Sequence, residues 1–212
     1  NGIFTGESYD ARLEMPGWCA AGFDDAAWTR AAVVRAPAGT LRAQAAPVDR
    51  VPGATPVFSE PFEGGFRFDA RRNMAGWARV EMTGPRGRTV TLRFREDTGR
   101  DHGQRDSYVL KGEGVERWAP RFTWHGFRTV EVSGLERPPK VWVEDVHSGV
   151  ERAGRFECSN PLFNQIHETF VRTQLANMHG GVTSDCPHRE RLGYTGDGQV
   201  AAQAAIYALD ME

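Results

Sequence analysis

Two stretches, "RTVTLRF" (88–94) and "PRFTWHGFRTVEVSG" (120–134), decide the fold, because side-chain character alternates along both. In the first, Val90, Leu92 and Phe94 would share one face of a strand, with polar residues on the other face. Similar stretches occur at 66–70, 76–82, 106–111 and 140–148. Glycine-rich turns separate them. Short strands at this spacing predict an antiparallel β-sandwich.

Aromatic residues are frequent in this part of the chain. They are Phe66, Phe68, Trp77, Phe94, Trp124, Phe127 and Trp142. Large apolar rings in alternating strands are mostly core residues, and we expect most of these in the core. The alternative is an exposed aromatic platform on which sugar rings stack.

The first 52 residues are rich in alanine, glycine and proline and show no sustained period. We expect an irregular segment there, held down by the aromatic side chains of Tyr9, Trp18, Phe23 and Trp28. The stretch 36–56 contains four prolines and predicts an extended linker.

The pattern changes to a helical period near residue 151. A helix is predicted from about 161 to 177, with Pro161 at its first position and Ser159 or Asn160 as its N-cap. A second helix is predicted over 197–211, after a long loop without a period.

Two helices cannot enclose a core of their own, so their apolar faces need cover from the sandwich or from a second copy in a homo-oligomer. The predicted fold class is therefore mixed, an antiparallel β-sandwich followed by helices. The expected divisions are 1–52, 53–150 and 151–212.

Composition restricts the function. Hydrophobic residues make up 40% of the chain and charged residues 25%, with a net charge of −2, which argues against a nucleic-acid partner. No apolar run approaches the roughly 20 residues that span a bilayer, so no membrane partner is expected. Three widely spaced cysteines indicate neither a disulfide framework nor a zinc site. The chain starts without methionine and ends in an apolar helical run, and we expect a piece of a longer protein.

The stretch "SDCPHRERLGYTGDGQ" (184–199) concentrates ionisable side chains in a loop. Asp185, Glu190 and Asp197 are a candidate carboxylate set for glycoside hydrolysis, which needs an acid and a second carboxylate. Three other interpretations stay open: a surface ion-pair network, a Ca²⁺ loop without the EF-hand spacing, and a nucleophilic pair of Cys186 and His188.

The sequence "DCPHRERLGYTGD" (185–197) resembles the active-site signature of the inverting α-L-rhamnosidases of glycoside hydrolase family 78, usually DCPQR-(D)-ERLGWTGD. Further similarity occurs in the same order along the chain. "GESYDAR…GW…FDDAAW" resembles the end of the family's N-terminal accessory domain, and "WAPRFTWHGFRTVEVSG" resembles one of its strand pairs. "GRFECSNPLFNQIHETFVRTQLANM" resembles the entry to its (α/α)6 barrel of the six-hairpin glycosidase type.

The resemblance implies a role for each matching residue. Glu190 matches the general acid, and Asp185 and Asp197 match acidic residues that bind the rhamnose hydroxyls. The remaining substrate-binding positions are His188, Arg189, Arg191 and Tyr194, the two arginines being expected to orient the carboxylates. His188 and Tyr194 depart from the family pattern, which usually has Gln and Trp there.

The expected partner is a rhamnose-containing oligosaccharide or glycoside, with no cofactor and no metal, and the expected location is the bacterial cytoplasm. The family's base is a Glu in a later barrel loop, so these 212 residues alone are expected to be inactive. Two alternatives remain, a carbohydrate-binding β-sandwich module without catalysis and a six-hairpin glycosidase acting on another sugar.

Overall fold

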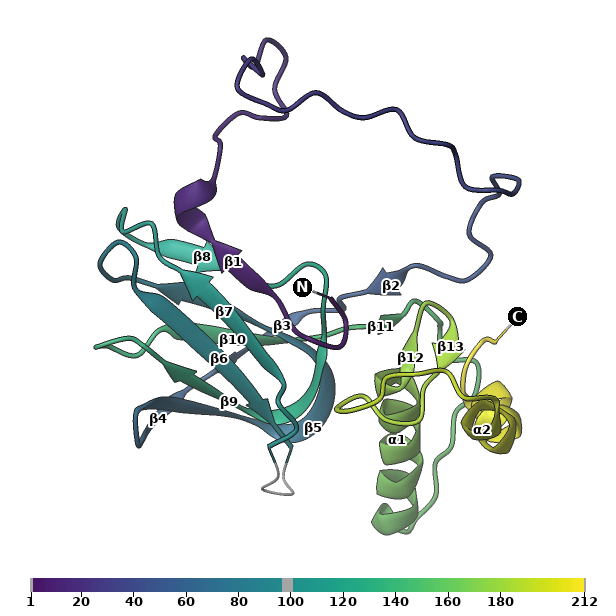
Figure 1. The fold of residues 1–212 in the computed structure, drawn as a ribbon. Helices are drawn as coiled ribbons and strands as arrows, with labels where there is room; N and C mark the ends of the chain where they lie inside the picture. Colours follow the sequence, from purple (N-terminus) through teal and green to yellow (C-terminus); the bar gives the residue numbers. More distant parts are fainter. Residues whose placement is uncertain (1, 97–100, 212) are drawn as a thin grey trace.

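A computed structural model describes residues 2–96 and 101–211 (Figure 1). A β-sandwich forms one half of the molecule and two helices lie beside it, with the loop that precedes the second helix between the two halves. Residues 14–48 form a wide arc that leaves the body of the molecule and returns to it. The bounds of the strands and helices are β1 Ser8–Asp10, η1 Ala11–Leu13, β2 Asp49–Arg50, β3 Ala54–Val57, β4 Ser59–Phe62, β5 Gly65–Met82, β6 Thr89–Arg95, β7 Arg105–Val109, β8 Glu116–Trp118, β9 His125–Ser133, β10 Lys140–Asp145, β11 His147–Ser148, α1 Pro161–Ala176, β12 Met178–His179, β13 Val182–Thr183 and α2 Thr195–Ala208.

The main sheet has the order β1-β7-β6-β9-β5-β10-β3, with β4 and β8 also paired to β5. Its pairs are antiparallel except β1 with β7, which is parallel. Residues 65–76 of β5 pair with β9, and with β4 at their start, whereas residues 76–82 pair with β10 and β8. One long strand therefore passes from one layer of the sandwich into the other.

This long strand corrects the prediction of two separate strands at 66–70 and 76–82. The register of β5 against β9 shifts between Asp69 and Met74, and Arg71 adopts a positive φ of 64° there. Such an irregularity bends a strand while its pairing continues on both sides. The break in alternation was therefore a bulge and not a turn.

The core of the sandwich contains the alternating residues that predicted it. Val90, Leu92 and Phe94 are fully buried, and Phe68 and Phe127 join them. The predicted core is confirmed for these rings, so they cannot serve as a platform for sugars.

The N-terminal segment differs from its prediction. Tyr9 stacks on Tyr108 in the sandwich, but Trp18 and Trp28 are exposed and do not hold their segment down. The strand β1 of this segment forms an edge of the main sheet. The predicted extended linker 36–56 contains secondary structure at its end, because β2 and the start of β3 fall within it.

The helices follow their predicted positions to within a few residues. The side chain of Asn160 accepts a hydrogen bond from the backbone N–H of Leu162, which confirms Asn160 as the N-cap of α1. Each helix buries only a narrow stripe and leaves much of its apolar surface exposed. The exposed apolar residues of the two helices are Leu162, Phe163, Ile166, Val200, Ile206 and Tyr207.

Candidate active site

A tight hairpin starts the loop that carries the predicted acid. Strands β12 and β13 are joined by Gly180 and Gly181, whose φ angles of 62° and 76° suit the two-residue turns that glycine favours. The N–H of Gly181 donates to Ser148 Oγ in β11, so the hairpin is attached to the small sheet of β11 and β2 that follows the last strand of the sandwich. From there the chain enters the loop 184–194, which ends at α2.

His179 of this hairpin packs against the sandwich. Its ring stacks on Trp124 with the ring centres 3.6 Å apart and the planes 5° from parallel. Its Nε2 is 2.9 Å from the carbonyl oxygen of Val146, to which it can donate. Burial lowers the pKa of His179 to about 4, so the ring is neutral at pH 7.

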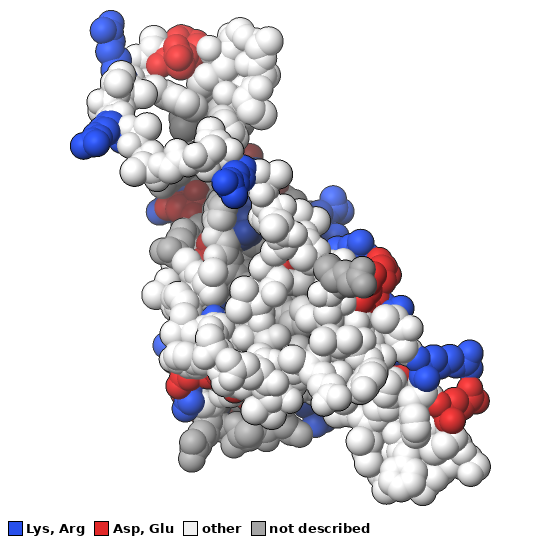
Figure 2. Space-filling model, turned by 90° about the vertical axis from the view of Figure 1, so that its right-hand side faces the viewer, with Lys and Arg blue, Asp and Glu red and all other residues white. Residues whose placement is uncertain are grey.

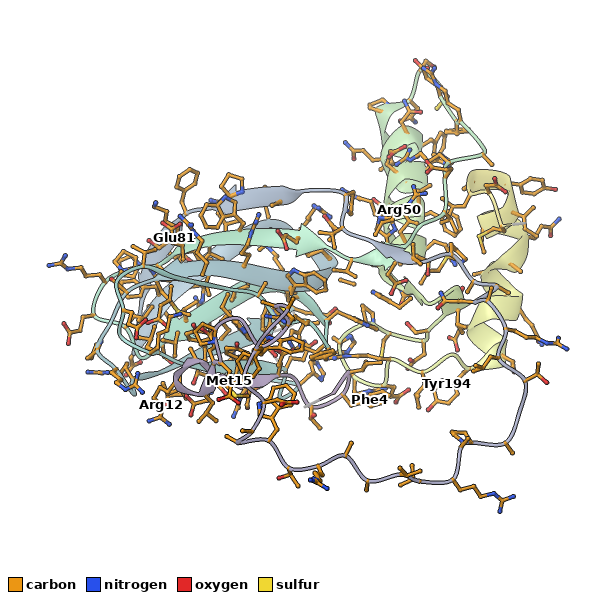
Figure 3. All side chains as sticks on the ribbon, turned by 90° about the horizontal axis from the view of Figure 1, so that it is seen from above. Phe4, Arg12, Met15, Arg50, Glu81 and Tyr194 are labelled. Atoms are coloured by element: carbon orange, nitrogen blue, oxygen red, sulfur yellow. The ribbon has the colours of Figure 1, made fainter. Side chains whose placement is uncertain are left out.

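Arg191 attaches the loop itself to the sandwich. Its guanidinium donates to the carbonyl oxygen of Trp124 at 2.6 Å, to Gln104 Oε1 at 3.0 Å and to the carbonyl oxygen of Ile3. The side chain also lies over the Trp124 ring, 5.1 Å from its centre. The residue is 8% exposed, and burial lowers its pKa to about 10. Figure 3 labels Tyr194 on the stretch of the loop that leads into α2.

A second row of buried polar groups supports Arg191. Its Nη2 is 3.4 Å from His125 Nδ1, and His125 Nε2 is 2.9 Å from Asp106 Oδ2. Burial lowers the pKa of His125, although Asp106 opposes the shift. A neutral ring that donates from Nε2 to Asp106 and accepts at Nδ1 from Arg191 satisfies both neighbours.

The hydrogen bonds of Arg191 lead away from the carboxylates of its loop. The resemblance implied that it orients the carboxylates of its loop, whereas its hydrogen bonds go to the sandwich. Its positive φ of 54° turns the chain so that the side chain leaves the loop in that direction. Its partners Gln104 and His125, and Asp106 behind His125, were not predicted as part of the site; of these, His125 alone lies in the family-like stretch "TWHGFR" (123–128).

Glu190 and Asp185 lie close together in the loop. One carboxyl oxygen of each, with the Sγ of Cys186, falls within 4.8 Å of the others. The Cys186 thiol donates to Asp185 Oδ2 at 3.2 Å, and the other oxygen, Oδ1, is buried without a hydrogen-bond donor. Arg189 pairs with Glu190 at 2.8 Å from the exposed side.

The contact between the two acids shifts their pKa values in opposite directions. The hydrogen bond to Asp185 raises the pKa of Glu190, and the opposing charge of Arg189 does not cancel the effect. Burial acts to raise the pKa of Asp185 as well, but hydrogen bonds from Glu190 and Cys186 outweigh it and lower that pKa. One proton on Glu190 can therefore be shared between the two carboxyl groups.

Asp185 and Asp197 line one open hollow with a volume of about 440 Å³ between α1, α2 and the loop. Asp197 lies in the first turn of α2, where the helix dipole favours a carboxylate. Apolar walls come from Phe170 and Val200. Asp185 therefore lines this hollow and also contacts Glu190.

The remaining predicted residues are not gathered in this hollow. Tyr194 precedes α2 and is 48% exposed. His188 faces the sandwich, with its Nδ1 3.3 Å from Glu96 Oε2. Its ring lies edge-on to the ring of His102, with the ring centres 4.4 Å apart. The loop passes so close to Gly126 that a Cβ there would be 2.8 Å from the His188 backbone nitrogen.

Three family models match successive parts of the chain. Residues 1–52 match the alpha-L-rhamnosidase N-terminal domain, and residues 63–150 match the bacterial alpha-L-rhamnosidase concanavalin-like domain. Residues 151–212 match the bacterial alpha-L-rhamnosidase 6 hairpin glycosidase domain. The fold class is thereby confirmed as a concanavalin-like β-sandwich followed by the start of a six-hairpin glycosidase domain. The chain therefore belongs to a family of glycoside hydrolases. That family is the α-L-rhamnosidases of glycoside hydrolase family 78.

Individual relatives agree with this assignment. A curated alpha-L-rhamnosidase of Streptomyces avermitilis is 37% identical over 98% of this chain, and one of Formosa agariphila is 31% identical over 100%. The chain spans 22% and 24% of these relatives, about a quarter of their length.

Solved structures of relatives share the fold. The alpha-L-rhamnosidase from Dictyoglumus thermophilum matches 100% of this chain at 35% identity and a TM-score of 0.92, over 26% of its own length. The Streptomyces avermitilis enzyme, solved in complex with L-rhamnose, matches 98% of this chain at 37% identity and a TM-score of 0.87, over 22% of its length.

The surface carries charges of both signs. On the face that Figure 2 shows, lysines and arginines lie scattered among acidic and uncharged residues and form no continuous basic area among the residues drawn. Within residues 2–96 and 101–211, no helix combines the length and the apolar character that a membrane crossing requires.

Proposed function

We propose that this chain forms part of an enzyme that removes terminal α-L-rhamnose residues from rhamnosides by inversion, with Glu190 as the general acid. One observation carries the proposal: Glu190 contacts Asp185, and this contact raises the pKa of Glu190. A general acid must hold a proton near neutral pH, and a neighbouring carboxylate favours the protonated form. Family membership supplies the reaction and the sugar.

The base of the reaction is a different residue from Asp185. An inverting glycosidase separates its acid and base by roughly 6.5–9.5 Å, so that a water and the sugar fit between them. The carboxyl oxygens of Asp185 and Glu190 lie within 4.8 Å of each other, which leaves no such room. In this proposal the base comes from outside the residues described, and the chain alone does not turn over substrate.

Asp185 and Asp197 are proposed to bind the sugar hydroxyls from the hollow that they share. Carboxylate oxygens accept hydrogen bonds from hydroxyl groups, and charged acceptors make the stronger bonds. Arg189, which pairs with Glu190, and the exposed Tyr194 are proposed to contact the sugar or its leaving group. Arg191 is proposed to act indirectly, by holding the loop.

The test is product analysis with the full-length protein. We expect release of rhamnose from an aryl α-L-rhamnoside, with the β-anomer appearing first in the NMR spectrum because the reaction inverts the anomeric centre. A panel of other aryl glycosides serves as the control. Faster cleavage of another sugar would replace the proposed substrate, and initial appearance of the α-anomer would rule out inversion.

A further inference from the structure

Three metal-ligating side chains gather where the acid-bearing loop meets the sandwich. Glu96 follows β6, His102 lies in the connection to β7, and His188 belongs to the loop. One ligand atom from each lies within 4.8 Å of the other two, and all three residues are partly buried. This cluster takes no part in the proposed hydrolysis.

We propose that Glu96, His102 and His188 form a binding site for a divalent transition-metal ion of the zinc class. Two imidazoles and one carboxylate are a ligand set that zinc accepts, with a fourth position left for water. Ligand atoms around tetrahedral zinc are roughly 3.3–3.5 Å apart, given bond lengths of about 2.0–2.2 Å. His188 Nδ1 and Glu96 Oε2 already meet this spacing at 3.3 Å. The ring centres of His102 and His188 are 4.4 Å apart, and the ligand atom of His102 lies within 4.8 Å of the other two, so it must approach by at most about 1.5 Å to reach the zinc spacing.

The site would join two parts of the molecule. Glu96 and His102 come from the sandwich, whereas His188 lies two residues before Glu190. A bound ion would therefore fix the loop to the sandwich close to the acid. His188 is one of the two positions at which the loop departs from the usual signature, so the site is a property of this chain and not of the signature.

A second group of ligating atoms lies nearby and must be distinguished in any test. Asp185, Cys186 and Glu190 also lie within 4.8 Å of one another, but they include a thiol. Cobalt(II) separates the two groups by spectroscopy, because a thiolate ligand adds an intense charge-transfer band in the near ultraviolet that imidazole and carboxylate ligands lack.

The experiment is calorimetric titration of the full-length protein with zinc chloride after treatment with a chelator. We expect one ion per chain, binding at least tenfold weaker in His188→Gln and in His102→Gln. His167→Gln, which changes a histidine on α1 away from the cluster, is the matched control and should bind as the parent does. Circular dichroism checks that each variant is folded.

Cobalt(II) binding should give visible d–d bands of a four- or five-coordinate ion without a thiolate band. Absence of zinc binding, or equal binding by the parent and both histidine variants, would overturn the proposal and leave an ion pair between His188 and Glu96. A thiolate band would move the ion to Cys186 and also overturn it. None of these results depends on rhamnosidase activity.

Discussion

Replacing Arg191 by alanine should release the acid-bearing loop from the sandwich. The substitution removes the guanidinium that donates to the carbonyl oxygens of Trp124 and Ile3 and to Gln104 Oε1. Among the described residues, those acceptors keep only their other donors, the Thr123 hydroxyl and the Gly126 N–H. The loop has no strands or helices of its own between 184 and 194, so this side chain is a main attachment to the sandwich.

The size of the effect follows from two opposing terms. Hydrogen bonds from a charged donor contribute about 2 kcal/mol each, or about 6 kcal/mol for three. Burial lowers the pKa of Arg191 from 12.5 to about 10, which corresponds to a desolvation cost of about 3 kcal/mol. The difference, about 3 kcal/mol, would increase local opening of the loop by about 150-fold.

Hydrogen–deuterium exchange of the peptide 184–197 measures this opening directly. Arg191→Ala should accelerate exchange there and leave the central strands β6 and β9 unchanged. Arg189→Ala is the matched control, because Arg189 is the neighbouring arginine with a side chain 61% exposed. Unchanged exchange in Arg191→Ala, or equal acceleration in both variants, would refute the attachment.

Three further changes test the surroundings of the loop. Asp185→Asn should lower the pKa of Glu190, because it removes the carboxylate that favours the protonated form; carbon-13 NMR titration of the Glu190 carboxyl measures this, and an unchanged pKa would contradict the pairing. Protonation of His179 is disfavoured in the folded state, so its docking is complete above pH 6.5 and loses about 3 kcal/mol as the pH falls towards 4. His179→Phe keeps an aromatic ring and should remove that part of the pH dependence in the exchange of residues 177–183; a curve like that of the parent would exclude His179 as its source. Gly126→Ala places a Cβ 2.8 Å from the loop backbone and should weaken docking of the loop by about 1–3 kcal/mol. This should appear as faster exchange over 184–197, and unaltered exchange would show that the loop shifts to accept the methyl group without losing its docking.

Periodicity in the sequence predicted the sandwich because burial imposes alternation on strands. Val90, Leu92 and Phe94 are buried on one face for this reason. The same signal fails where the backbone departs from regular geometry. The irregularity between Asp69 and Met74 interrupts alternation without ending the strand, so the sequence indicated two strands where one exists.

The exposed aromatics Trp18 and Trp28 show a second limit. An aromatic residue in an irregular segment predicts burial only if another part of the chain offers it a surface, and hydropathy does not show that surface. Trp28 packs near Phe23 of the same segment instead.

The candidate site was predictable where side chains close in sequence act together. Asp185, Cys186 and Glu190 lie within six residues, and one loop brings them into contact. The partners of Arg191 lie far from it along the chain, with Gln104 87 residues away. Tertiary folding creates such contacts, and no local pattern encodes them. The pairing of His188 with Glu96 belongs to the same class.

The central claim is that Glu190 is the general acid, and its most direct test is the leaving-group dependence of Glu190→Gln in the full-length protein. A general acid contributes about 10²- to 10⁴-fold when the leaving group needs protonation. We predict a loss of that size for an alkyl rhamnoside and a much smaller loss for 2,4-dinitrophenyl rhamnoside, whose leaving group departs unprotonated. An equal loss for both substrates, or normal turnover of the alkyl rhamnoside, would contradict the assignment.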